Sequence, residues 1–355
     1  MELLHHYLTV VAQTLHEEDN DHLLRKVWTS QVPRMALKQP FLLAAVLSTA
    51  ALHLATVRSE PSGPQDLDKS SPSSFLYSAK SPASLTLSSD ISMSGQSSPW
   101  TVQGNQTGID VNHYVQAQRF YFNLAVRGQI QNTINLMNIS PEAADATCIA
   151  SLMISNQGFL VTSDSESEPV DSIYHPPVRW LTLASSSPII IRTAREWLPR
   201  NSAIWTLIEG SHRTANRSKT THCDENRQPY APLLDYDTLP EPDFTPEIEE
   251  AYEKTLNFMG SIRRGILDNE PETTLARRFL EFALYAPKPF SECVDKHRPR
   301  ALVILAHLFA MTKKVEGSWW FRGAAERHVY GIRNIVPPEW QWAMEGPLRD
   351  LTNNE

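Results

Sequence analysis

Cysteine and histidine are the side chains of this chain that could serve as nucleophiles, bases or metal ligands. The 3 cysteines, Cys148, Cys223 and Cys293, are far apart and odd in number, so they fit reduced thiols better than a disulfide framework. Cys293 precedes a basic run at 296–298, and nearby cations can lower the pKa of a thiol. An ordinary structural cysteine is the simpler interpretation, and we prefer it.

The histidines occupy positions typical of structural residues. His5 and His6 are adjacent, so on a helix they point about 100° apart, and we expect one buried and one solvated imidazole rather than a metal site. His53 and His307 interrupt apolar helical segments. A core histidine hydrogen-bonded to a backbone carbonyl explains each of them better than a general base does.

Sequence motifs that mark catalytic or cofactor sites are missing. The chain has no GxGxxG, GxxxxGKS/T, GxSxG, HExxH or CxxC pattern, and glycine is scarce at 13 residues. Residues 235–237 (Asp-Tyr-Asp) are the nearest approach to an aspartate cluster that could hold magnesium diphosphate. We therefore predict no catalytic residue, no cofactor and no metal ion.

Composition and charge indicate a large core and exclude a basic DNA-binding module. Hydrophobic residues make up 41% of the chain, and its net charge is −8. The apolar runs Phe41–Ala55 and Ala301–Met311 are shorter than the roughly 20 residues that cross a bilayer, so both predict buried helices. The N-terminus lacks the basic region of a signal peptide, and we expect an intracellular protein without a membrane span.

Apolar residues recur at helical spacing through most of the chain, and no sustained period-2 segment is bounded by hairpin turns. The first stripe consists of Leu4, Tyr7, Leu8, Val11 and Leu15. A second, from Leu24 to Val32, is expected to end before Pro33, and separate helices are expected around Trp180, from Pro188 to Trp197 and from Ser202 onward. Ser140-Pro141 and Thr245-Pro246 each predict a helix start, with a capping residue followed by proline. The prediction is an all-α fold: one large irregular helical domain of about a dozen helices with two long polar loops.

The composition also predicts how the chain is divided. Residues 1–57 form the first helices, and 109–355 form the rest of the helical domain, with a polar loop at about 211–242. Between them, 58–108 is rich in Ser and Pro and cannot bury enough apolar surface to offset its ordering entropy, so we predict a disordered insertion. Three Ser-Pro pairs in it could be proline-directed phosphorylation sites, although a passive loop is the simpler interpretation: they begin at Ser71, Ser81 and Ser98.

The C-terminal stretch has the highest density of large apolar side chains. Trp319, Trp320 and Phe321 open a second helical pattern, predicted at 318–336 and stopped by Pro337-Pro338. Large rigid aromatics are mainly core residues, but they can also line a cavity for an apolar ligand. The candidate residues for such a pocket are Phe309, Trp320, Phe321 and Met344.

Both ends of the chain resemble one protein family. Residues 2–15 and 27–55 are similar to the start of the fungal-specific regulatory domain of binuclear zinc-cluster transcription factors. The matching positions are Trp28, Val32-Pro33, Pro40-Phe41-Leu42-Leu43 and Ala51-Leu52-His53-Leu54-Ala55. Residues 299–323 and 335–347 resemble that domain's ending, with an apolar helix, a paired Trp and two closing Trp residues. The sterol-uptake regulators are the most similar subgroup.

The resemblance implies an all-helical regulatory domain that acts on transcription, located in the nucleus, or otherwise in the cytoplasm. It implies control of a metabolic or biosynthetic gene set through a hydrophobic small molecule (sterol-like or a pathway metabolite), through homo- or heterodimerisation with a zinc-cluster regulator, or both. Family members carry a six-cysteine zinc cluster ahead of this domain, whereas this sequence has 3 scattered cysteines. We therefore expect no sequence-specific DNA binding by this chain alone.

Two alternatives remain open at this stage. The helical domain could have been reused by a biosynthetic enzyme, for example for a cyclisation in an apolar cavity, where shape and one positioned acid leave no motif. The gene model could also be truncated, with an exon upstream of Met1 encoding the zinc cluster.

Overall fold

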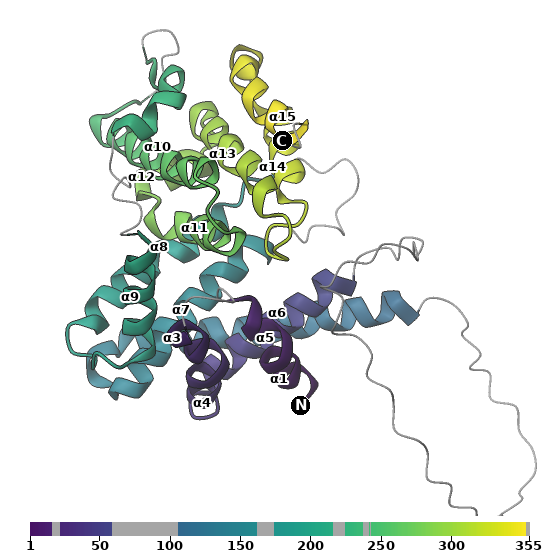
Figure 1. The fold of residues 1–355 in the computed structure, drawn as a ribbon, viewed down its shortest axis with the longest axis vertical. Helices are drawn as coiled ribbons and strands as arrows, with labels where there is room; N and C mark the ends of the chain where they lie inside the picture. The colour runs from purple at the N-terminus through teal and green to yellow at the C-terminus, as the bar shows by residue number, and fades with distance from the viewer. Residues whose placement is uncertain are drawn as a thin grey trace, which may run out of the picture.

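The computed structural model describes residues 1–15, 22–58, 106–161, 174–215, 224–236, 241 and 243–352. This part of the chain is all-α and contains no strand, which confirms the predicted fold class (Figure 1). Most of the predicted Ser/Pro-rich insertion, its three Ser-Pro pairs and Cys223 lie outside the described residues. The helices that border the insertion reach to Arg58 and begin again at Gln106.

The N-terminal helix contains a π-helical segment. It runs through α1 (Glu2–His6), η1 (Tyr7–Val11, π) and α2 (Ala12–Thr14). The wider π turn places residues about four apart on one side, so Tyr7 and Val11 are buried while Leu8 of the predicted stripe is exposed.

The next helix continues through a proline at which we expected it to end. It consists of α3 (His22–Lys26), η2 (Val27–Gln31, π) and α4 (Val32–Ala36), with Pro33 in the first turn of α4. A proline ring normally clashes with the carbonyl four residues earlier and removes one hydrogen bond. The π turn that precedes Pro33 widens the helix at this point, so the boundary predicted before Pro33 is wrong.

Helix α5 (Pro40–Arg58) is the centre of the N-terminal half. It includes the predicted buried run Phe41–Ala55 and is long and apolar enough to span a membrane, but most of it is buried by other parts of this protein, as in a core helix. Helices α6 (Gln106–Ile134) and α7 (Pro141–Val161) pack against it. Gln157 of α7 accepts a hydrogen bond from Ser48 at 2.5 Å and donates one to Thr49 at 3.0 Å.

Helix α7 begins where the sequence predicts. The Ser140 hydroxyl accepts the backbone N–H of Ala143 at 3.2 Å, after the short 3-10 helix η3 (Leu136–Asn138). Helix α8 (Val178–Arg195) differs from the two separate helices expected there, because it runs through Pro188. The Ser155 hydroxyl of α7 donates to the carbonyl of Leu183 at 3.3 Å and so joins α7 to the turn of α8 that precedes this proline. Helix α9 (Ala203–Ala215) follows.

The C-terminal half starts with η5 (Asp224–Leu234), a 3-10 helix within the range where the sequence predicts a polar loop. Helices α10 (Pro246–Leu267), α11 (Glu272–Tyr285) and α12 (Lys288–Asp295) come next. The start of α10 at Pro246 is as predicted, but Thr245 hydrogen-bonds the side chain of Glu247 instead of capping the backbone.

The last elements are α13 (Pro299–Met311), η6 (Thr312–Val315), α14 (Ala324–Ile335), η7 (Pro338–Met344) and α15 (Glu345–Thr352). The tryptophan pair lies in the turn before α14, although the sequence predicts a helix from Ser318. Gly323 has a φ of 65° and caps α14, so the helix cannot begin earlier.

Figure 1 shows α10 to α15 together at one end of the molecule and α1 to α7 with α9 at the other, with α8 between them. Buried apolar side chains from both halves form one continuous core. The N-terminal helix also contacts the turn before α14, because the indole Nε1 of Trp319 donates to the Thr14 hydroxyl at 3.0 Å.

Candidate functional site

The centre of the core is a cluster of aromatic side chains around Phe309 of α13. The ring of His328 stacks on Phe309 with centroids 3.9 Å apart and an interplanar angle of 21°. Phe159 of α7 contacts both Phe309, at 6.1 Å between centroids, and Phe321, at 5.2 Å. Trp180 of α8 meets Phe159 edge to face at 5.0 Å. Four separate elements therefore converge on one apolar centre.

His328 is the polar member of this cluster. Its Nδ1 lies 2.8 Å from the Tyr174 hydroxyl, and burial lowers the pKa of its imidazole to about 3. The imidazole is therefore neutral at physiological pH. Within the part of the chain that the structure describes, His328 Nε2 and the indole Nε1 of Trp180 are buried without a hydrogen-bond partner. Each of these nitrogens could form a hydrogen bond with an oxygen of a water or a ligand that entered the cluster.

The structure brings together two of the four residues predicted to form an apolar pocket. Phe309 and Phe321 both pack on Phe159, while Trp320 packs against Trp319 at an interplanar angle of 30°, with centroids 3.9 Å apart. All four predicted side chains are buried, including Met344 on η7. A cavity of about 10 Å³ lies beside Trp320, which is room for about one water molecule. An apolar ligand at these residues would therefore require the helices to separate.

The two histidines predicted within apolar helices have different partners. His307 hydrogen-bonds the backbone of Ala343, as expected for a core histidine, and burial lowers its pKa to about 4. The ring nitrogen of His53 lies 3.0 Å from that of His6, so its partner is an imidazole and the prediction of a backbone carbonyl is wrong. Burial lowers the pKa of His53 to about 4 and also lowers that of His6. Of the adjacent histidines, His5 is exposed and His6 half-buried.

A buried charged network surrounds Glu241. Its carboxylate accepts hydrogen bonds from the Tyr252 hydroxyl at 2.8 Å, from Arg298 at 3.2 Å and from Arg300 at 3.3 Å. The Arg300 side chain has no solvent exposure and also donates to the carbonyl of Leu233. The network links η5, α10 and α13.

Cys293 borders this network and is buried. Burial raises the pKa of its thiol, and this effect exceeds the lowering by Tyr252 and by Arg298. The basic residues after Cys293 therefore do not activate it, in agreement with the structural interpretation of this cysteine.

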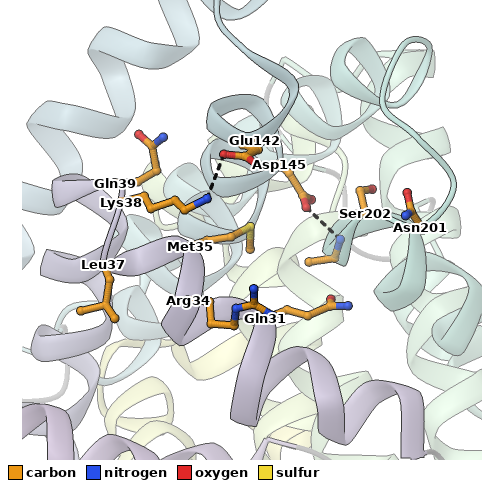
Figure 2. A pocket seen from close by; sticks show the side chains of 11 residues that line it. Gln31, Arg34, Met35, Leu37, Lys38, Gln39, Glu142, Asp145, Asn201 and Ser202 are labelled. Carbon is orange, nitrogen blue, oxygen red and sulfur yellow. Dashed lines mark hydrogen bonds and ion pairs between the residues drawn. The ribbon is translucent and has the colours of Figure 1, made fainter.

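A cleft lies elsewhere, between η2, α4 and the N-terminal ends of α7 and α9 (Figure 2). Its volume is about 440 Å³, within the range of small-molecule sites. Arg34, Lys38 and the exposed Leu37 lie on one side, and Glu142 and Asn201 on the other. Lys38 reaches Glu142 across the cleft, with Nζ to Oε2 at 3.5 Å.

Asp145, which lines this cleft, stabilises the start of α9. Its two carboxylate oxygens accept the backbone N–H groups of Ala203 at 2.8 Å and Ile204 at 2.9 Å, so it caps α9 from a neighbouring helix. Burial raises its pKa, and the two backbone hydrogen bonds partly oppose this rise. Sequence reasoning missed the cleft because its residues come from three distant segments and form no motif.

Metal coordination finds no support in the described residues, where no group of three or more His, Cys, Asp or Glu side chains could hold an ion. The cleft carries amide, cationic and carboxylate side chains, but its buried carboxylate is committed to the backbone of α9. The described residues therefore form a packed helical domain with an open cleft between η2, α4, α7 and α9.

Comparison with known proteins gives two relatives along most of the chain. The chain is 23% identical over 370 aligned residues, 98% of its length, to a Zn(2)-C6 fungal-type transcription factor of Gibberella zeae. It is 23% identical over 312 residues, 86% of its length, to the Zn(2)-C6 fungal-type transcription factor afumD of Aspergillus fumigatus.

These matches support a relation to the Zn(2)-C6 fungal-type transcription factors. The relation agrees with the resemblance read from both ends of the sequence. The chain spans 61% and 65% of the length of these two relatives. No protein-family model matches it.

Proposed function

We propose that this chain is a helical regulatory domain that controls transcription of a metabolic or biosynthetic gene set in the nucleus. The observation that carries the proposal is the similarity to Zn(2)-C6 transcription factors along 98% of the chain. The all-α fold, with one core across both halves and buried polar groups committed to structural bonds, supports it. Contact with DNA would come from a zinc cluster, carried either by the full protein or by a partner regulator.

The proposed signal is a hydrophobic small molecule, sterol-like or a pathway metabolite, in the aromatic core. Phe309, Trp320, Phe321 and Met344 would contact its apolar part. The unpartnered nitrogens of Trp180 and His328 would bind one oxygen atom of the ligand. Because the core is closely packed, the ligand would bind a more open arrangement of α13 and α14 and shift the population toward it.

Pairing with another zinc-cluster regulator is the second proposed input, as a homo- or heterodimer. It is compatible with ligand binding, since a ligand that changes the packing of α13 and α14 would also change any surface these helices present. Size-exclusion chromatography with light scattering, with and without a candidate partner, measures it directly.

A gene deletion in the native organism tests the proposed function against the enzyme alternative. If the protein regulates transcription, the transcripts of a whole gene set fall or rise together. If it catalyses one step of a pathway, one intermediate accumulates while the transcripts stay unchanged. The second outcome would contradict the proposed regulatory role and support the enzyme alternative.

The ligand needs a separate experiment. Organic extraction of the purified protein followed by mass spectrometry, and thermal shift with a sterol panel, are the measurements. We expect a stabilising ligand in the wild type and a loss of that shift in Phe321→Ala. A protein that yields no extractable apolar compound and no thermal shift would contradict sensing, while leaving the transcriptional role intact.

A further inference from the structure

Helix α6 carries a row of exposed apolar side chains on the side that faces solvent. Phe120 is 60% exposed, Leu124 42%, Ile130 51% and Ile134 73%. Large exposed apolar side chains gathered on one element mark an interaction surface more often than a free surface. We propose that this side of α6 binds an acidic amphipathic helix of a partner protein.

The positions of these residues fit a helix-binding stripe. At 100° per residue, Phe120, Leu124 and Ile134 lie within about 80° of one another around the helix, and Ile130 borders them. From Phe120 to Ile134 the stripe is about 21 Å long, at 1.5 Å per residue. This length matches about four turns of a partner helix, which would place apolar residues at i, i+3, i+4 and i+7.

The opposite side of α6 already has its partners, so the stripe is not part of the core. Tyr114, Gln118, Phe122 and Ala125 are buried where α6 packs along α5 and α7. The Gln118 carbonyl accepts from the Ser48 hydroxyl of α5 at 3.1 Å. The fold therefore does not require apolar residues on the outer side.

Charge indicates which partner fits. Residues 111–134 contain no Asp or Glu, although the whole chain has a net charge of −8. Arg127 lies on the stripe and Arg119 beside it, and neither has an ion-pair partner among the described residues. Two guanidinium groups next to an apolar row complement a helix whose apolar residues are flanked by carboxylates.

The same charges disfavour two other occupants. A second copy related by a two-fold axis through the middle of the stripe would place Arg127 against Arg127, which costs energy. A membrane surface is bound by helices rich in Lys and Arg along their polar side, whereas the polar positions of this stripe include the neutral amides of Asn123 and Gln131.

The test is a binding titration of the full chain with a fluorescent 20-residue peptide. The peptide carries Leu or Phe at i, i+3, i+4 and i+7 and Glu or Asp elsewhere, and its scrambled version is the control. We expect about tenfold weaker binding, which corresponds to about 1.4 kcal/mol, for Arg127→Glu and for the Phe120→Ser/Ile134→Ser double variant. Both changes are on the surface, so circular dichroism and the unfolding midpoint should stay as in the wild type.

Two matched variants control for charge and for exposed apolar area. Arg34→Glu reverses an exposed arginine in the cleft, and Ile189→Ser removes an exposed isoleucine on α8. Both should bind the acidic peptide as the wild type does. Added salt should weaken the wild-type interaction more than that of Arg127→Glu, because the ion pairs are screened.

Several outcomes would overturn the proposal. Equal affinity for the scrambled peptide, or unchanged peptide affinity in both α6 variants, would show that the stripe is not a specific helix-binding site. A wild-type dimer that Phe120→Ser/Ile134→Ser converts to a monomer would assign the surface to a second copy. Binding to phosphatidylserine vesicles that Arg127→Glu abolishes, without binding of the acidic peptide, would assign it to a membrane.

Discussion

The imidazole of His328 lies nearly parallel to the ring of Phe309, with centroids 3.9 Å apart, and its Nδ1 is 2.8 Å from the Tyr174 hydroxyl. This arrangement holds a titratable group in the most apolar part of the core. A protonated imidazole would carry an uncompensated charge between aromatic rings, so the native structure requires the neutral form.

Acid should therefore destabilise the protein through His328. Its pKa is about 3 in the native state and 6.5 when unfolded, so below pH 6.5 only the unfolded state takes up the proton and stability falls with pH. From pH 7 to pH 5 this histidine alone should lower the free energy of unfolding by about 2 kcal/mol. Urea titrations between pH 7 and pH 5, on the wild type and on His328→Phe, measure this loss of stability.

In His328→Phe the loss between pH 7 and pH 5 should be about 2 kcal/mol smaller than in the wild type. The variant should also be less stable at pH 7 by about 1–2 kcal/mol, because the Tyr174 hydroxyl loses its partner. His297→Asn, at an exposed histidine, is the control and should leave the pH dependence unchanged. If the free energy of unfolding of His328→Phe fell with pH in parallel with that of the wild type, another group would be the cause of the acid sensitivity.

Glu241→Gln should be among the most destabilising changes in the chain. The carboxylate pairs with Arg298 and Arg300, both mostly buried, and its removal leaves two cations without their counter-charge. Breaking a buried pair costs about 3–5 kcal/mol. Glu250→Gln, in an exposed pair with Lys254, should cost less than about 0.5 kcal/mol. Similar midpoints for the two variants in urea would contradict the structural role of the network.

Gly260→Ala should separate η5 from α10. A Cβ at Gly260 would lie 2.1 Å from the backbone oxygen of Asn226, which cannot move without shifting η5. We expect a cost of about 2–3 kcal/mol for this overpacking. Gly210→Ala is the matched change, because there the Cβ meets the flexible end of Leu24 at 2.6 Å, and the cost should stay below about 1 kcal/mol. The difference is measured by thermal and urea unfolding, and the reverse order would be evidence against this packing.

Asp145→Ala should destabilise α9 even though the two residues that Asp145 holds are about sixty positions away. The variant leaves the N–H groups of Ala203 and Ile204 unpaired inside the protein, at a cost of about 2 kcal/mol. Glu142→Ala, at the rim of the same cleft, removes only an exposed pair with Lys38 and should cost less than about 0.5 kcal/mol. Hydrogen exchange at the start of α9 should increase in Asp145→Ala alone.

The helical period of the sequence was sufficient for the fold class and for many of the helices. Buried α5 and α13 follow directly from runs without charged residues, and the start of α7 from its Ser-Pro cap. The errors cluster at prolines. Pro33 and Pro188 lie inside continuous helices, and the π turn that precedes Pro33 is not visible in a local pattern.

The candidate site was less predictable, because it depends on which segments meet. The aromatic content around Phe309 and Phe321 was evident from the sequence, but not the approach of His328 and Trp180 from two other helices. The cleft at Asp145 and the pairing of His6 with His53 depend on distant segments in the same way. Tertiary packing decides these contacts, and no spacing in one segment encodes them.

The contact between the N-terminal helices and the turn before α14 has a consequence for the protein while it is being synthesised. Trp319 donates to Thr14 and packs against His53 at 4.8 Å, so the N-terminal helices gain these partners only when the last tenth of the chain is being made. Until then, the apolar helix α5 of the nascent chain lacks the side chain of Trp319, which packs against it in the native structure. A transcript that stops before Trp319 should therefore yield a polypeptide that chaperones retain and proteases remove.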